Sequence, residues 1–394
     1  MSTYMKRFLK NFDFPLFFTY LVLCLFGLVM IYSASMGAAV ERYKAEPDNF
    51  FQNQVLNLAI ALPVFFMASF FPYKNYKRKK IMILSVLGMF SLLFLVHFIG
   101  WGKEEVGARS WLITPFGKLQ PSEVAKIVII IYFSSVFAKK YESGTIDNIN
   151  QSIAPPIAIL IVAVGSIMLE TDLGGSLIIV VVALSVLLAS GIKKRTFFKL
   201  SGIISIGMLF AGLILFVKWK DIMNDGRLGR LLSFMNPFDY EQGSGYQVSN
   251  GYIAIGTGGL KGLGLGNSIQ KMGYLPEPHT DVIMAVISEE LGLVGALIVI
   301  GGLGFIVMRA FSIALRAQDP QARMLAAGIG SLIGIQTFIN LGGLTGLIPL
   351  TGVTLPFISY GGTSIILLSL ALGILMNVSM FVKYEKTNRK GSAL

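Results

Sequence analysis

The sequence predicts an all-α polytopic membrane protein with about ten transmembrane helices and one long extracellular loop between the seventh and eighth. Hydrophobic residues make up 54% of the 394 residues and charged residues only 14%, which is too apolar for a set of soluble domains. The apolar residues gather into runs of roughly 15 to 27 residues, lengths that suit helices crossing or nearly crossing a bilayer. Polar residues are instead concentrated between positions 218 and 280.

The ten expected spans form a single domain over residues 1–394 and are joined by short connections, apart from the loop at 218–281. Their approximate limits are 14–35, 53–71, 81–100, 122–138, 153–169, 176–190, 200–217, 282–308, 324–348 and 362–382. The first run is about twice as long as a signal-peptide core and more spans follow it, so we expect an uncleaved anchor.

Positive charge predicts the orientation of these spans. With a cytoplasmic N-terminus, 21 of the 33 Lys and Arg residues fall in cytoplasmic segments, 11 fall in outer segments, and Lys126 lies within a span. This excess predicts that both termini are cytoplasmic and that residues 270–281 lie on the outer face. The net charge of +12 is then explained by positive segments on the cytoplasmic side, which face anionic lipid, and we expect no nucleic-acid partner.

Several functional classes lack their sequence patterns. Neither nucleotide-binding glycine loop occurs, so ATP or NAD binding is unsupported. The two histidines, His97 and His279, provide no zinc-ligand spacing, and the single Cys24 allows no intrachain disulfide. The long loop interleaves glycines with aromatic and β-branched residues. We therefore expect short helices and turns on the outer membrane surface, some of them re-entrant.

The segment 270–292, QKMGYLPEPHTDVIMAVISEELG, runs from a polar loop into an apolar helix and carries acids across the junction. Asp281 marks the boundary, and it is either a helix cap or a base at the mouth of an outward-facing cavity. These alternatives compete, because backbone N–H groups bonded to a carboxylate lower its pKa. Glu289 and Glu290 point about 100° apart, and each either pairs structurally or takes part in chemistry.

Cations are expected near this acid. Glu123 and Lys126 share one helix face at i, i+3, so Lys126 either pairs with Glu123 or meets a phosphate from the outer leaflet. Arg227 and Arg230, three residues apart in the long loop, suit lipid headgroups or a pyrophosphate, which guanidinium groups bind in a bidentate manner.

Further polar and aromatic residues lie on the same predicted outer side. Arg109 and Trp111 precede the fourth span, where tryptophan commonly anchors at the membrane interface. His279, next but one to the acid, is either a titrating partner or incidental. Residues 351–364, TGVTLPFISYGGTS, predict a re-entrant or tightly turned segment. An anionic, lipid-linked substrate fits these features best.

Motifs over nearly the whole chain resemble the SEDS family, whose members polymerise, or were proposed to flip, the lipid-linked precursor of the bacterial cell wall. Residues that match its C-terminal signature are Asn340, Gly346, Pro349, Gly352, Ser359, Tyr360, Gly361, Gly362, Thr363 and Ser364. Segments 109–111 and 120–126 resemble its earlier motif, and 245–247 with 274–281 resemble its long outer loop. Within the family, this loop is most similar to that of the cell-division member.

The resemblance implies a ten-helix, inverting peptidoglycan glycosyltransferase that uses lipid II as donor and acceptor and releases undecaprenyl diphosphate. It implies that Asp281 is the general base. Either protein cations or a divalent cation, Mg²⁺ or Mn²⁺, would then bind the diphosphate, and the ligands of such a metal are unknown. The substrate-binding residues that it suggests are Arg109, Trp111, Lys126, Arg227, Arg230, Glu277, His279 and Ser359.

The resemblance also implies a cytoplasmic-membrane location enriched at the septum. The expected partners are a class B penicillin-binding transpeptidase and other divisome membrane proteins. A lipid II flippase and a scaffold that only positions the transpeptidase are the alternative functions. The chain departs from the family pattern at 170–175, Glu-Thr-Asp-Leu-Gly-Gly, and at Gly273 and Thr351, so we assign no catalytic role there.

Overall fold

The computed structural model describes residues 10–102, 109–114, 117–200, 202, 234–241, 243 and 245–392, with side chains described as far as residue 388. Within this part of the chain, eight helices are long and apolar enough to cross a membrane, which confirms the all-α membrane class. They are α2 (Phe14–Glu41), α3 (Asn49–Phe70), α4 (Lys79–Ile99), α6 (Pro121–Glu142), α7 (Ala154–Leu169, preceded by the π-helical turn η2, Ile149–Ile153), α13 (Ile283–Arg316), α14 (Pro320–Leu344) and α15 (Gly362–Ser392).

Two predicted spans differ from these eight. The run at 176–190 forms α8 (Leu173–Ala189), an apolar helix of 17 residues that is shorter than the others. The run at 200–217 lies outside the described residues except for positions 200 and 202. A small hairpin of β1 (Leu112–Thr114) and β2 (Gly117–Leu119) lies between α4 and α6. It was not predicted from the sequence.

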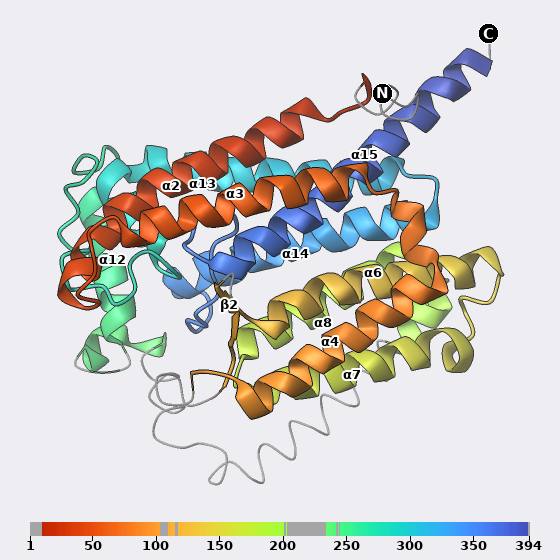
Figure 1. Ribbon diagram of the computed structural model, residues 1–394, viewed down its shortest axis with the longest axis horizontal. Coiled ribbons are helices and arrows are strands. Elements are labelled where there is room, and N and C mark those ends of the chain that lie inside the picture. Colours follow the sequence, from red (N-terminus) through yellow and green to blue (C-terminus); the bar gives the residue numbers. More distant parts are fainter. Residues whose placement is uncertain are drawn as a thin grey trace.

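The helices pack as two groups that share α14 (Figure 1). Helices α2, α3, α13, α14 and α15 enclose most of one apolar core, and α4, α6, α7 and α8 enclose most of the other. Helix α14 packs against α13 on one side and against α8 and α6 on the other. Helix α2 begins and α15 ends at one end of the bundle, whereas α12 (Tyr246–Gly258) lies at the opposite end (Figure 1).

A buried aspartate joins three helices at the end of the bundle where α2 begins and α15 ends (Figure 1). The Asp13 carboxylate accepts hydrogen bonds from Arg309 Nε and Nη2, both at 3.0 Å, and from Ser379 Oγ at 2.7 Å. Lys383 Nζ lies 3.5 Å from the same carboxylate. The start of α2 is thereby joined to α13 and α15, and the buried negative charge has two cationic partners.

Helix α13 breaks at Gly292, whose backbone is non-helical with φ 60° and ψ −152°. A break leaves carbonyl groups without their intrahelical donors, and a buried carbonyl needs a replacement. The long loop supplies it, because Leu263 N donates to Glu289 O and Gly264 N donates to Glu290 O, both at 2.9 Å. The loop is therefore inserted into the helix and shares its backbone hydrogen bonding.

Two glycines allow this insertion. A Cβ atom added at Gly258 would lie 1.9 Å from Ser288 O, and one added at Gly262 would lie 2.2 Å from Glu290 O. Gly262 also has a φ of +76°, which side-chain-bearing residues rarely adopt. The glycines of this loop therefore serve close backbone packing against α13.

Candidate active site

Asp281 lies in the turn before α13 and is 9% exposed. Its carboxylate accepts hydrogen bonds from two neutral donors. Gln247 Nε2, on α12, lies 3.3 Å from Oδ1 and 3.2 Å from Oδ2, and Thr280 Oγ1 lies 3.1 Å from Oδ1. The N-cap residue of α13 is Val282, with no side-chain capping bond. Asp281 therefore does not serve as the cap that was one of the two sequence-based alternatives.

The electrostatic surroundings of Asp281 favour proton uptake. Burial raises the pKa of its carboxyl above the ordinary value, and the nearby charge of Glu277 acts in the same direction. Hydrogen bonds from Thr280 and Gln247 partly oppose this rise in pKa. Among the described residues, no lysine or arginine lies within ion-pair distance of Asp281. A carboxylate with a raised pKa is a stronger base than one held by a cation.

Segments distant in sequence hold the backbone around Asp281. Asn340 Nδ2, on α14, donates to Asp281 O and to Val353 O, both at 2.7 Å. Ser359 Oγ donates to Thr280 O at 2.6 Å and accepts from a backbone N–H of its own segment. The C-terminal signature and the acid-bearing turn, which match the family as separate motifs, therefore form one structural unit.

The 276–281 turn also packs against the start of α3, through Phe50, and the end of α2, through Arg42. His279 is 1% exposed and its ring centroid lies 4.1 Å from that of Phe50 and 5.5 Å from that of Tyr360. This burial lowers the pKa of His279 to about 4, so the imidazole is neutral near pH 7. Glu277 has a φ of 53° and lies 3.4 Å from Arg42 Nη1.

Lys126 is buried and paired, as one of the sequence-based alternatives predicted. Its Nζ lies 2.6 Å from Glu123 Oε1 and 3.4 Å from Gln336 Oε1, and Lys126 is 2% exposed. Gln336 Nε2 donates in turn to Thr354 O at 3.1 Å, so this pair is linked to the segment between α14 and α15. Contact between Lys126 and a phosphate stays a prediction.

Arg109 and Trp111 lie between α4 and α6, in the helix group formed by α4, α6, α7 and α8. Arg109 Nη1 donates to His97 O at 3.2 Å at the end of α4, and Trp111 packs edge-on against Trp101 with a centroid distance of 6.3 Å. Within the described residues, the structure gives neither side chain a contact with the Asp281 turn. Their substrate contacts stay predictions.

Arg227 and Arg230, also predicted to bind substrate, lie outside the described residues. Asp172, in the segment that departs from the family pattern, has a structural role. Its side chain caps α8 by accepting from Gly175 N at 2.7 Å, and it also accepts from Ser122 Oγ at 2.9 Å.

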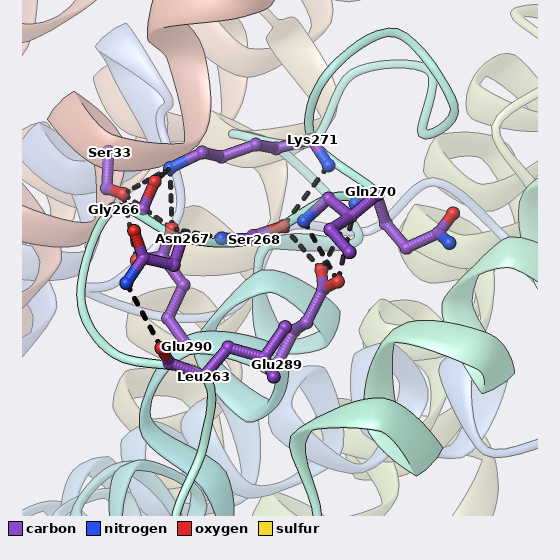
Figure 2. A network of polar contacts seen from close by, with 10 residues as sticks. Ser33, Leu263, Gly266, Asn267, Ser268, Gln270, Lys271, Glu289 and Glu290 are labelled. Atoms are coloured by element: carbon purple, nitrogen blue, oxygen red, sulfur yellow. Dashed lines mark hydrogen bonds and ion pairs between the residues drawn. The ribbon is translucent and has the colours of Figure 1, made fainter.

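Glu289 and Glu290 are fully buried and bind the long loop (Figure 2). Glu290 accepts from Lys271 Nζ at 2.6 Å and from Ser33 Oγ of α2 at 2.7 and 2.8 Å. Glu289 accepts from Ser268 Oγ and from two backbone N–H groups of the same turn. Both glutamates therefore have structural partners, although their side chains leave the helix in different directions.

Gln247 and Asn340 are the site residues that sequence reasoning missed. Both stood in segments that were noted as motifs, but their direct contacts with Asp281 depend on how α12 and α14 pack. In the described part of the chain, no group of three or more His, Cys, Asp or Glu side chains could hold a metal ion. The divalent cation stays a prediction, and no chemical step below is assigned to it.

A family model described as cell cycle protein, FtsW/RodA/SpoVE, matches residues 14–384. The probable peptidoglycan glycosyltransferase FtsW of Bacillus subtilis (strain 168) is 44% identical over 394 residues, covering 99% of this chain and 96% of that protein. Stage V sporulation protein E of the same organism is 36% identical over 365 residues, covering 92% and 96%.

Solved structures share the fold. A chain described under "Structural coordination of polymerization and crosslinking by a peptidoglycan synthase complex" superposes with a TM-score of 0.74 at 24% identity, covering 94% of this chain and 98% of that one. The rod shape determining protein RodA of Thermus thermophilus superposes with a TM-score of 0.64 at 23% identity, covering 93% and 96%. At these identities the likeness shows the fold alone.

Proposed function

Because the chain belongs to the FtsW/RodA/SpoVE, or SEDS, family of cell cycle proteins, we propose that it is a peptidoglycan glycosyltransferase that polymerises lipid II. The observation that carries the proposal is Asp281, a buried carboxylate with neutral hydrogen-bond donors and no described cationic partner. This is the environment that a general base needs. The name of the Bacillus subtilis relative supports the same activity.

In the proposed reaction, Asp281 takes the proton from the 4-hydroxyl of the acceptor sugar while that oxygen attacks the anomeric carbon of the donor. The bond from the anomeric carbon to the pyrophosphate oxygen breaks, and undecaprenyl diphosphate leaves with the bonding electron pair. Attack from the opposite face inverts the configuration at the anomeric carbon. The bonds from Asn340 and Ser359 to the 280–281 backbone would hold the base in place during this step.

Negative charge develops on the leaving diphosphate, and cations would stabilise it. The proposed groups remain Arg109, Lys126, Arg227 and Arg230, as the resemblance suggests, with a divalent cation as the alternative. The structure adds Arg42, whose side chain is 57% exposed and lies beside Glu277 in the turn that leads to Asp281.

Reaction on the outer face of the cytoplasmic membrane is supported by the arrangement of the chain. Helix α12, whose Gln247 bonds to Asp281, lies at the end of the bundle opposite the start of α2 and the end of α15 (Figure 1). The excess of Lys and Arg in the predicted inner segments favours cytoplasmic termini, which would put Asp281 outside. The 44% identity to a relative named FtsW favours a role at the division septum.

A class B penicillin-binding transpeptidase is the proposed partner. One solved structure with this fold is described as coordinating polymerisation and crosslinking within one complex. A polymerase of linear glycan strands requires a second activity to crosslink them, so association with a transpeptidase fits the proposed product. Other divisome membrane proteins are proposed on the resemblance alone.

Helix α14 favours the transferase over the flippase. It has buried polar side chains near its ends, Gln321 on one side and Gln336 and Asn340 on the other. Every buried position of α14 between 321 and 336 is apolar. The buried face of α14 itself therefore offers no polar side chain to a headgroup over about 20 Å.

Labelled lipid II mixed with the purified protein and its transpeptidase partner tests the proposal. We expect glycan ladders from the unaltered protein and none from Asp281→Asn, with Glu241→Gln as a matched control. Glu241 is an exposed acid in the same loop region. Ladders of normal length and yield from Asp281→Asn would overturn the role of Asp281. Lipid II scrambling without any ladder would favour the flippase.

A further inference from the structure

We infer that Gln247 is a positioning residue that orients the carboxylate of Asp281 for proton abstraction, an inference that rests on the proposed function. The Gln247 amide nitrogen lies 3.3 Å from Oδ1 and 3.2 Å from Oδ2 of Asp281. The amide NH2 group thus lies within hydrogen-bond distance of both carboxylate oxygens. Among the described residues, Gln247 is the only side chain outside the 276–281 turn that donates to this carboxylate.

The position of Gln247 is set by how α12 is fixed at each end. Near its start, Ser249 Oγ donates to Pro237 O at 3.0 Å, and Gly245 N donates to Tyr240 O at 3.1 Å. At its end, Gly258 lies directly against Ser288 of α13, as described above. Gln247 lies in the first turn of this helix and is half-buried, so the amide is presented to Asp281 by a rigid support.

The chemistry of an amide suits this role better than that of a cation. An arginine or lysine at the same place would hold the proton-accepting oxygen in an ion pair and lower the pKa of Asp281 strongly. A neutral N–H group fixes the orientation of the carboxylate and gives a smaller reduction in pKa. The base therefore keeps most of the proton affinity that burial confers.

Thr280 Oγ1 donates to Oδ1 from the neighbouring position in the chain, whereas Gln247 is the donor that a separate helix brings to the carboxylate. No hydrogen bond to the Asp281 carboxylate comes from the other described side chains around it. Glu277 is the nearby charge that raises the pKa of Asp281, and Arg42 lies beyond it in an ion pair with Glu277. His279 is buried and neutral near pH 7, and Tyr360 packs against the His279 ring. The residue that α14 contributes, Asn340, binds the Asp281 backbone and carries no charge.

The test is the pH dependence of the initial polymerisation rate on labelled lipid II, measured with the full chain and its transpeptidase partner. The variants are Gln247→Leu, which removes the donor, and Gln247→Glu, which keeps the shape and adds a like charge. Thr257→Ala is the matched control, because Thr257 is exposed on the same helix and its hydroxyl bonds only within α12.

We expect Gln247→Leu to move the acidic limb of the rate profile up by about one pH unit, since the charged form of Asp281 loses a donor. On that limb the rate falls roughly 10-fold, and raising the pH restores it. Gln247→Glu should give a larger shift in the same direction. Thr257→Ala should leave the profile unchanged.

Two outcomes would overturn the inference. A loss that is equal at every pH would mean that Gln247 only supports the fold, and an unchanged acidic limb in both variants would mean that it does not act on Asp281. If Gln247→Leu does not fold, Gln247→Glu alone decides. Asp281→Asn, measured in parallel, distinguishes a failure of the proposed function from a failure of this inference. Full activity of Asp281→Asn contradicts the proposed function. An inactive Asp281→Asn together with unshifted rate profiles of the Gln247 variants contradicts this inference alone.

Discussion

Two buried aspartates lie at opposite ends of the bundle and differ in what surrounds them. Asp13 accepts two hydrogen bonds from Arg309, one from Ser379, and lies 3.5 Å from Lys383. The Asp281 carboxylate has only neutral donors among the described residues, namely the side chains of Gln247 and Thr280 and its own backbone N–H group. The same residue type, similarly removed from solvent, is thus compensated at one end and uncompensated at the other.

The difference fits a structural role for Asp13 and the proposed role of Asp281 as a base. A buried carboxylate that is fully paired joins helices, because removing either partner leaves an uncompensated charge. A buried carboxylate without a cation has a raised pKa and a higher affinity for a proton. Burial alone therefore does not distinguish the two aspartates, whereas their hydrogen-bond and ion-pair partners do.

The largest expected effect is the loss of activity in Asp281→Asn. The amide keeps the shape of the carboxylate but cannot accept a proton, so the polymerisation rate should fall by a factor on the order of 10² to 10⁴. The thermal midpoint in detergent should stay close to that of the unaltered protein. An inactive protein with a strongly lowered midpoint would mean that Asp281 resembles Asp13 after all.

The matching substitution at the other end, Asp13→Asn, should lower the free energy of unfolding and leave the polymerisation rate per folded molecule largely unchanged. Arg309 and Lys383 are about a quarter and a third exposed, so we expect a loss of about 2–3 kcal/mol, below the range for fully buried pairs. Denaturation in detergent measures it, with Glu142→Gln as the control for an exposed ion pair. A rate per folded molecule that drops as far as in Asp281→Asn would erase the distinction between the two ends.

The pair between Lys271 and Glu290 should behave like Asp13, although Glu290 lies on α13, the helix that follows Asp281. Each single variant, Lys271→Met and Glu290→Gln, leaves a buried group without its ion-pair partner, and the double variant removes both members of the pair. We expect the free energies of unfolding in this double-mutant cycle to differ from additivity by about 1–3 kcal/mol. Additive effects would show that the two side chains do not depend on each other.

The smallest expected effect is that of His279→Gln on the pH profile. Asp281 must be deprotonated to act as a base, so the rate should fall as the pH drops through its raised pKa. The pKa of His279 is about 4, so this imidazole should contribute no limb near pH 6.5. The variant should therefore keep the shape of the rate profile and lose less than about 10-fold in rate, through weaker packing on Phe50. If the acidic limb of the rate profile disappears in His279→Gln, the titrating group is His279 and not Asp281.

Sequence reasoning was effective where the physical cause is local. A run of apolar residues long enough to cross a bilayer is a local property, and eight of the predicted spans are helices of that kind. The i, i+3 pairing of Glu123 with Lys126 is local too, and the structure contains it. The place of Asp281 at the loop–helix junction also followed from a change in polarity along the chain.

Contacts between distant segments could not be predicted in the same way. Gln247 and Asn340 lie 34 and 59 residues from Asp281, and nothing in their own neighbourhoods indicates that they meet it. Glu289 and Glu290 bind different groups of the long loop, and both have partners because the loop is inserted at a break in the helix. That break required the non-helical backbone of Gly292, which the sequence presented only as one glycine in an apolar run.

The insertion of the long loop into α13 has a consequence for how its backbone exchanges with water. The amides of Leu263 and Gly264 belong to a loop, yet they bond to carbonyls of a transmembrane helix. Their deuterium uptake should be as slow as that of α13 amides and much slower than that of the amide of Glu241, an exposed residue of the same long loop. In a labelling experiment this stretch of loop should therefore open only when the helix does.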